Sequence, residues 1–254
     1  MFSFEKDCRA VRERSPLILN ITNHVAMNFT ANALLAIGAS PLMSSEQEEM
    51  VELTIMCSAL VVNIGTLEKA QLEAQKTAAK TAIMLGRPWV LDPAGVGASR
   101  FRSAAVRELI ALHPSVIRGN ASEILFLAGG EARSRGVDST EDSARAVEAG
   151  KRLARDSGAV VSISGPTDYI TDGEEVVSIE GGSPLMPQVT AMGCAATAIT
   201  GAFLAVDEDP LRAAAGAMSL MSAAGGDAAL ASEGPGTFAA RFIDSLWKKS
   251  GQYE

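Results

Sequence analysis

The segment Leu17-Ile18-Leu19-Asn20-Ile21, with the residues that follow it up to Gly38, decides the fold class. Leu17–Ile21 is a short apolar run, which is typical of a buried strand. Val25–Ile37 then places apolar residues at helical spacing and ends at Gly38. The segment therefore predicts a strand-turn-helix unit, in which a buried strand leads into a helix that packs on the sheet.

The same alternation continues along the chain. Further strands are predicted at Pro41–Met43, Ala59–Ile64, Trp89–Leu91, Val116–Ile117, Val160–Ser164, Tyr169–Thr171 and Val176–Ile179. The helices are predicted at Ser45–Cys57, Leu67–Leu85, Phe101–Leu112, Ala195–Val206, Pro210–Ser232 and Thr237–Lys249. Thr171-Asp172-Gly173 favours a hairpin turn between the last two strands. We therefore expect an α/β fold, a three-layer α/β/α sandwich with a mostly parallel central sheet.

Length and composition favour a single domain over residues 1–254. The chain has no low-complexity tract, no repeat of fixed period and no block of like charge that would mark a linker. Its most polar connection, Gly129–Asp142, is short enough to be a loop. A chain of 254 residues can bury a substantial core as one unit.

Charge and cysteine content narrow the function classes. The formal net charge of −8 and the pI near 5.0 oppose nonspecific binding to nucleic acid or anionic membranes. The charged N-terminal segment MFSFEKDCRAVRERS does not resemble a signal peptide, and no stretch is typical of a membrane span, so we expect a cytoplasmic protein. Cys8, Cys57 and Cys194 lack short metal-ligand spacing, which excludes a typical structural zinc site.

Polar residues recur where the predicted strands end. Asn23, Met43, Asp92, Asn120 and Ser164 all fall at or just after such ends. In α/β sheets, ligands bind beyond the carboxyl ends of the strands, where connections leave to either side. We therefore expect the site there, although Asn23 also fits a helix cap and Met43 also fits the core.

A turn rich in proline and glycine, Gly182–Val189, leads to Thr190-Ala191-Met192-Gly193-Cys194 and a small-residue helix. The first N–H groups of a helix have no internal partner and favour negative charge, so Met192 and Gly193 are candidates for an anion hole. The same field would stabilise a thiolate, which predicts a lowered pKa for Cys194. The alternative for Cys194 is simple packing, since cysteine is often buried.

The sequence contains no phosphate loop of the Gly-x-x-x-x-Gly-Lys type. Gly95-Val96-Gly97 alone is weak evidence for a nucleotide-binding loop. Phosphoryl transfer nonetheless needs only positioning and neutralisation of charge. Asp92 and Glu123 follow consecutive strands and offer oxygen ligands for Mg²⁺, or else a turn and a helix start. Arg118 offers a fork of donors to a phosphate, or else an ordinary surface ion pair.

Five ordered motifs carry a family resemblance over nearly the whole chain. They are Ile21-Thr22-Asn23-His24-Val25, Asp92-Pro93-Ala94-Gly95-Val96-Gly97-Ala98, Arg118-Gly119-Asn120-Ala121-Ser122-Glu123-Ile124, Ser164–Gly173 and Val189–Cys194. In these motifs the chain resembles the hydroxyethylthiazole kinase family of thiamine salvage, in the ribokinase-like group. The resemblance implies a ribokinase-like kinase domain that phosphorylates the primary hydroxyl of 4-methyl-5-(2-hydroxyethyl)thiazole with ATP and Mg²⁺. The product would serve thiamine phosphate synthesis.

The resemblance also implies a role for each matching residue. It assigns catalysis to Cys194, ATP binding to Arg118 and Ser164, Mg²⁺ to Asp92 and Glu123, and thiazole binding to Asn23, Val25, Met43 and Ala191. It further implies a homotrimer with active sites between subunits. We expect Cys194 to accept the proton of the attacking alcohol and to align it, in the position where wider relatives carry an aspartate.

The chain departs from the family pattern in its catalytic turn. The family commonly has Gly-Thr-Gly, whereas this chain has Ala191-Met192-Gly193, and Ser164 stands where threonine is usual. A Cβ at residue 191 restricts the turn. The alternatives are a hydroxymethylpyrimidine or sugar kinase of the same fold, an ATP-dependent hydratase repair enzyme, and a non-catalytic regulator that binds thiazole or nucleotide.

Overall fold

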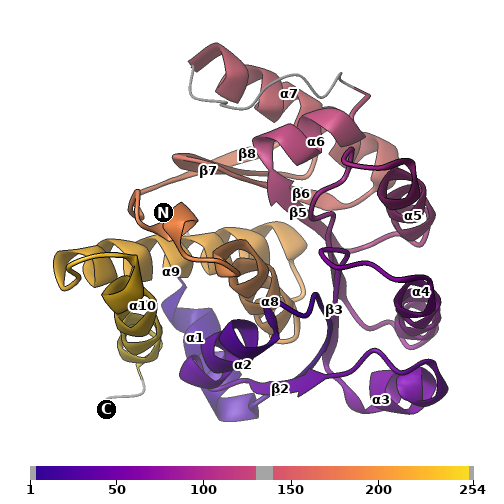
Figure 1. Cartoon of the computed structure of the whole chain (residues 1–254), viewed down its shortest axis with the longest axis horizontal. Helices are drawn as coiled ribbons and strands as arrows, with labels where there is room; N and C mark the ends of the chain where they lie inside the picture. Colours follow the sequence, from indigo (N-terminus) through magenta and orange to yellow (C-terminus); the bar gives the residue numbers. More distant parts are fainter. Residues whose placement is uncertain (1–3, 130–139, 252–254) are drawn as a thin grey trace.

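A computed structural model of the chain describes residues 4–129 and 140–251, which form layers around one eight-stranded sheet (Figure 1). The sheet order is β2-β1-β3-β4-β5-β6-β7-β8. The strands are β1 (Leu17–Ile21), β2 (Ser40–Met43), β3 (Ala59–Asn63), β4 (Trp89–Asp92), β5 (Val116–Asn120), β6 (Val160–Ser164), β7 (Thr167–Thr171) and β8 (Val176–Glu180). The pairs from β2 to β6 are parallel and the last two are antiparallel, which confirms the mostly parallel sheet and the predicted hairpin.

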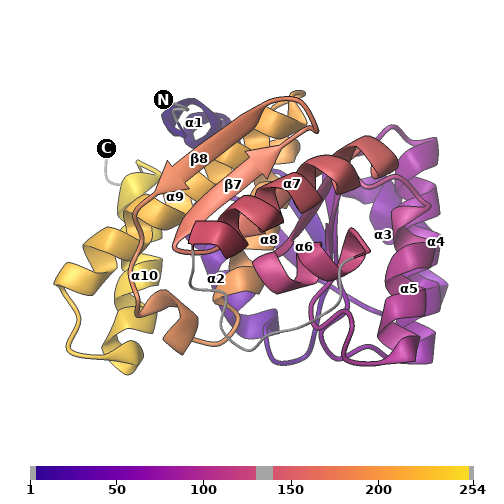
Figure 2. The ribbon, with the colours of Figure 1, turned by 90° about the horizontal axis from the view of Figure 1, so that it is seen from above.

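Helices cover both faces of the sheet, so the predicted three-layer α/β/α arrangement is confirmed (Figure 1). One layer holds α1 (Glu5–Arg14), α2 (Met27–Ala36), α8 (Met192–Leu204), α9 (Pro210–Leu230) and α10 (Pro235–Lys249). The other holds α3 (Met50–Met56), α4 (Lys69–Met84), α5 (Arg100–Ile110), α6 (Ala121–Leu127) and α7 (Thr140–Ser157). Seen from above, α9 runs along the β7–β8 hairpin and packs on it (Figure 2).

The central strands feed two separate cores. In β3, Val61 packs with the α8 layer, whereas Leu60 and Val62 pack with the α4 layer. Such strands are buried on both faces, which explains why they appear in the sequence as continuous apolar runs. In the two central strands β3 and β4 the polar residue stands at the end, where Asn63 closes β3 and Asp92 closes β4.

The structure corrects several predicted boundaries. The helix predicted at Ser45–Cys57 starts later, because Glu46 is extended, and it consists of a short 3-10 helix at Gln47–Glu49 followed by α3. The helix predicted to start at Ala195 begins at Met192, which brings Cys194 into its first turn. Most of the connection Gly129–Asp142 lies outside the described residues. Within the described residues, no helix is long and apolar enough to cross a bilayer.

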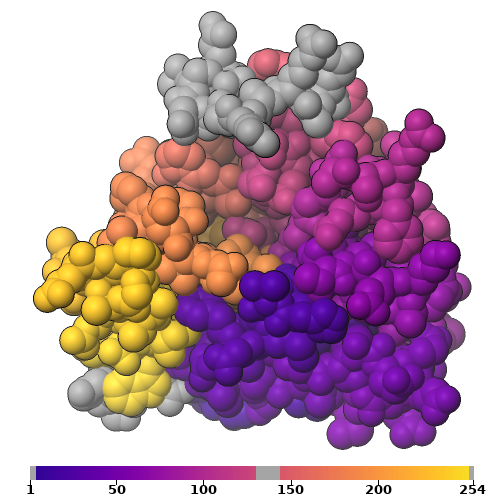
Figure 3. Space-filling model, in the orientation of Figure 1, coloured from indigo at the N-terminus to yellow at the C-terminus, as the bar shows by residue number. Residues whose placement is uncertain are grey.

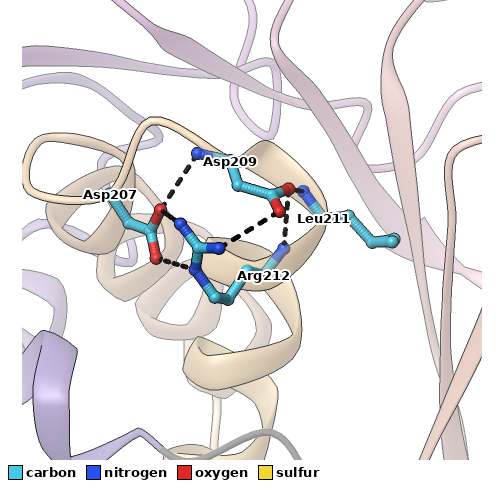
Figure 4. Close-up of polar contacts among 4 residues, drawn as sticks. All are labelled: Asp207, Asp209, Leu211 and Arg212. Carbon is cyan, nitrogen blue, oxygen red and sulfur yellow. Dashed lines mark hydrogen bonds and ion pairs between the residues drawn. The ribbon is translucent and has the colours of Figure 1, made fainter.

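A polar cluster fixes the start of α9 (Figure 4). The Asp209 carboxylate accepts hydrogen bonds from the backbone N–H groups of Leu211 at 3.0 Å and Arg212 at 3.2 Å, as expected of an N-cap. The guanidinium of Arg212 in turn forms a two-point ion pair with Asp207. The buried Asp7 side chain of α1 bonds to the same Asp207, so this cluster joins the first helix to the connection between α8 and α9.

Candidate active site

A cavity of about 810 Å³ opens at the carboxyl ends of the strands, between the segment that precedes α8 and the ends of β4, β5 and β6. The space-filling view shows the surface hollowed between these orange and magenta parts of the chain (Figure 3). Eight of the predicted site residues line it: Asp92, Arg118, Glu123, Ser164, Ala191, Met192, Gly193 and Cys194. The cavity therefore lies at the edge of the sheet where the strand ends predict a ligand site.

Cys194 lies in the first turn of α8 and accepts hydrogen bonds from two amides. The Nδ2 atoms of Asn23 and Asn63 lie 3.2 and 3.3 Å from its Sγ. Burial, and then the charge of Asp92, raise the pKa of the Cys194 thiol to about 11. The predicted lowering of this pKa is wrong, because loss of water and a nearby carboxylate outweigh the helix start and the two amides. Cys194 is a thiol at neutral pH.

The start of α8 leaves room for a charged group to lie close to its backbone. Ala191 adopts the left-handed conformation (φ 68°, ψ 2°), and no side chain caps the helix, which leaves the first N–H groups to face the cavity. At Gly193 a Cβ would lie 3.0 Å from Nη1 of Arg118. The absence of a side chain at Gly193 therefore lets the guanidinium lie against the helix start.

Arg118 extends from β5 into the cavity and is only 7 % exposed. Its Nε is buried and has no hydrogen-bond partner among the described residues. A buried cation with an unused donor is costly unless an anion meets it. The geometry of Arg118 thus fits an anionic ligand at the start of α8.

Asp92 and Glu123 also face the cavity. Asp92 accepts a hydrogen bond of 2.7 Å from Thr197, and Glu123 accepts the N–H groups of Gly95 and Asn120 at 2.9 and 2.8 Å. Burial raises the pKa of both carboxyls, and the charge of Asp92 raises that of Glu123 further. A divalent cation would relieve this repulsion. Residues 4–129 and 140–251 contain no cluster of three typical metal-ligating side chains, but Mg²⁺ needs only one or two carboxylates beside phosphates and water.

Two further polar residues line the cavity at β6 and β7. Ser164 donates a long hydrogen bond of 3.4 Å to the Gly119 carbonyl, and Asp168 accepts the N–H of Gly165 at 3.0 Å. Burial raises the pKa of Asp168. Beyond these polar groups the lining turns apolar, with Ile179, Met186, Met218 and Met221. The cavity therefore has a charged end and an apolar end.

Three predicted thiazole residues do not line the cavity. Asn23 lies buried beneath it and reaches it only through Cys194, while its Oδ1 accepts the Ala26 N–H at 3.0 Å. Val25 is 62 % exposed in the turn before α2, and Met43 is half-buried at the end of β2.

Sequence reasoning missed three polar residues of the site. Asn63 bonds Cys194, Thr197 bonds Asp92, and Asp168 lines the cavity near Arg118. A signal was present for Asn63, which ends a predicted strand as its neighbours do. Thr197 follows Gly193 by one helical turn, so helical spacing could have placed it on the same face.

Comparison with known proteins agrees with this geometry. The sequence profile of the Hydroxyethylthiazole kinase family matches residues 8–251. This chain belongs to that family. A hydroxyethylthiazole kinase of Brachyspira hyodysenteriae is 54% identical over 241 residues, covering 94% of this chain and 91% of the relative. A hydroxyethylthiazole kinase of Rhizobium etli strain CIAT 652 is 51% identical over 244 residues, covering 96% of this chain and 95% of the relative.

Solved structures agree with the assignment to the hydroxyethylthiazole kinase family. A hydroxyethylthiazole kinase protein from Pyrococcus horikoshii OT3 superposes with a TM-score of 0.89 at 36% identity, covering 96% of this chain and 92% of that one. A pyridoxal kinase from Staphylococcus aureus in complex with ADP gives a TM-score of 0.64 at 19% identity, covering 84% and 88%, which shows the fold alone. The fold is ribokinase-like, as the resemblance implied.

Proposed function

We propose that this protein transfers the γ-phosphoryl group of ATP to the primary hydroxyl of 4-methyl-5-(2-hydroxyethyl)thiazole. Membership of the hydroxyethylthiazole kinase family supports the kinase chemistry and the thiazole alcohol. The observation that carries the site is the start of α8, where Gly193, Cys194 and the buried Arg118 meet in one cavity. The product would be the thiazole phosphate used to make thiamine phosphate.

The charged end of the cavity suits the triphosphate. Arg118 would donate from its guanidinium to a phosphate oxygen, and the N–H groups of Met192 and Gly193 would receive the transferring group. Asp92 and Glu123 are the residues that would hold Mg²⁺, and the ion, when bound, neutralises charge on the phosphates. Ser164 would contact the nucleotide from the end of β6.

Cys194 acts, in this proposal, by alignment. Two amides already donate to its sulfur, and its raised pKa keeps the thiol proton in place at neutral pH. The S–H group therefore remains free to donate towards the acceptor oxygen or a phosphoryl oxygen. Because the alcohol loses its proton late in a loose phosphoryl transfer, alignment at this atom contributes without a preformed thiolate.

The thiazole side of the site calls for a neighbouring subunit. Val25 is exposed and Met43 lies outside the cavity, so a second copy packed over them would complete the pocket. Such an arrangement fits the homotrimer implied by the family resemblance, with Asn23 and Ala191 at the boundary between the two substrates.

We place the enzyme in the cytoplasm, where reduced cysteines are normal, since Cys8, Cys57 and Cys194 are all free.

The test is product identification by mass spectrometry after incubation with the thiazole alcohol, ATP and Mg²⁺. Thiazole phosphate together with ADP is the expected result, and hydroxymethylpyrimidine supplied in competition should remain largely unphosphorylated. Cys194→Ala should lower kcat by about ten-fold or more while the affinity for nucleotide changes little, because the sulfur serves alignment. Thiazole binding without any phosphorylated product would overturn the proposal in favour of a regulator.

A further inference from the structure

Asn63 occupies the point where three strand ends meet beneath the cavity. It is the last residue of β3, and it pairs in register with Asp92, the last residue of β4. On the other side of β3 lies β1, whose following turn carries Asn23. Asn63 is 1 % exposed and does not line the cavity. A buried amide at this place must satisfy its hydrogen bonds inside the protein.

The side chain of Asn63 satisfies all of them. Its Oδ1 accepts hydrogen bonds from Asn23 Nδ2 at 2.9 Å and from the Gly65 N–H at 2.8 Å. Its Nδ2 donates to Cys194 Sγ at 3.3 Å, and the side chain also bonds to the Asp92 carboxylate. An asparagine amide has two donor hydrogens and two acceptor sites, so this network fixes the orientation of the group.

The backbone around Asn63 is held equally firmly. Gln75 of α4 donates from Nε2 to the Asn63 carbonyl oxygen at 3.0 Å. The residue after next, Gly65, leaves room for Asn23, because a Cβ there would lie 2.7 Å from the Asn23 Cβ. Arg102 of α5 holds the following turn through the Ile64 and Gly65 carbonyl oxygens. A rigidly supported donor is what a catalytic group needs for a constant position.

We infer that Asn63 is a positioning residue for phosphoryl transfer, which holds the Cys194 sulfur in place and ties it to the Asp92 carboxylate. This inference rests on the proposed function. The rigid amide of Asn63 thus contacts both the Cys194 sulfur, on the side of the alcohol acceptor, and the Asp92 carboxylate, on the side of the metal. A displacement of about 1 Å at a reacting group can lower the rate by about a hundred-fold. Asn63 thus sets kcat without touching either substrate.

A purely structural role would give a different result, and a matched variant separates the two. Asn20 is another buried asparagine, on the adjacent strand β1, but its Nδ2 donates to the Ile18 carbonyl of its own strand and to no other group in the described part of the chain. Asn20→Ala and Asn63→Ala each remove one buried amide from the sheet. Asn63→Asp keeps the oxygen that Asn23 and Gly65 use, and replaces the donor that serves Cys194 and Asp92.

Three measurements on the purified full chain test the inference. Steady-state kinetics give kcat and the KM for ATP and for the thiazole alcohol, and thermal unfolding gives Tm. Alkylation of Cys194 by iodoacetamide, followed by mass spectrometry of its peptide, reports the sulfur environment without any turnover. The alkylation measurement still tests the contact between Asn63 and Cys194 if the wild-type protein phosphorylates nothing. That outcome would overturn the proposed function but not the contact.

Both Asn63 variants should lower kcat by about ten-fold or more, with each KM within about three-fold of wild type. Asn63→Asp should also slow alkylation of Cys194 by about ten-fold, because a new carboxylate opposes the thiolate. Asn20→Ala should keep kcat within about two-fold at a similar loss of Tm. The inference is overturned if Asn63→Ala and Asn63→Asp retain wild-type kcat, or if Asn20→Ala lowers kcat equally. If Asn63→Ala does not fold, Asn63→Asp alone decides.

Discussion

Asp7 of α1 provides a quantitative test of the polar cluster at the start of α9. The side chain is 3 % exposed and bonds to Asp207, whose own charge is balanced by Arg212 (Figure 4). Burial, and then the charge of Asp207, raise the pKa of Asp7 from 3.8 to about 6. For Asp207, burial opposes ionisation, but the hydrogen bonds from Arg212 lower its pKa overall. Asp7 therefore holds the proton of this pair.

The direction in which pH changes the free energy of unfolding follows from the linkage between protonation and folding. An acid whose pKa is higher in the folded state stabilises the fold at low pH, and this stabilisation is lost as the pH rises through the folded pKa. With the pKa moving from 3.8 to about 6, the free energy of unfolding should fall by about 2 kcal/mol between pH 4.5 and 7.5 through Asp7 alone. Asp7→Asn removes this titration and keeps a donor to Asp207.

Urea denaturation of wild type and Asp7→Asn at pH 4.5, 6.0 and 7.5 measures the effect. We expect the variant to gain about 2 kcal/mol relative to wild type across this range. Asp172→Asn serves as the control, since backbone N–H groups of Glu174 and Glu175 lower the pKa of Asp172, so its titration is almost complete below pH 4.5 and the difference from wild type should stay nearly constant over this range. A difference between wild type and Asp7→Asn that stays constant with pH would refute the reasoning.

Three further substitutions test the start of α8. Ala191→Gly should raise the free energy of unfolding by up to about 1 kcal/mol in urea titrations without loss of kcat, because glycine relieves the left-handed strain but is freer when unfolded; a loss of stability would contradict this. Gly193→Ala should raise the KM for ATP by about ten-fold in steady-state kinetics, because its Cβ displaces Arg118; an unchanged KM would remove Arg118 from nucleotide binding. Thr197→Val should lower kcat and reduce the free energy of unfolding by about 1–3 kcal/mol, because a buried carboxylate loses a partner. Thr200→Val, which loses only a bond to a backbone carbonyl, should leave kcat unchanged, and equal losses in both variants would contradict the role of that carboxylate.

Much of the fold and site could be predicted from local patterns. Continuous apolar runs located the parallel strands, and the polar residue at each strand end located the cavity. The helix α7 was missed although its sequence is strongly amphipathic, because its buried face consists mainly of small residues, Ala146, Ala149 and Ala154 beside Leu153. Alanine contributes little to an apolar pattern, although it packs closely against a sheet.

Other features depended on contacts that are remote in sequence. The direction of the Cys194 pKa shift depends on burial and on Asp92, which no local motif reveals. The role of Asn63 follows from its side-chain hydrogen bonds, three of which join residues remote in sequence: Asn23, Asp92 and Cys194. The family resemblance named Val25 and Met43, but their exposure and distance from the cavity follow only from the three-dimensional arrangement.

The hydrogen bond between Asn23 and Cys194 joins residues 171 positions apart. During synthesis, β1, β3 and β4 leave the ribosome long before α8 does. A nascent chain can thus present both asparagines and Asp92, yet it lacks the sulfur and the helix start until nearly four-fifths of the protein has been made. A ligand that binds at the start of α8 consequently cannot assist the early stages of folding during synthesis. It can stabilise only a chain in which α8 has already packed on the sheet.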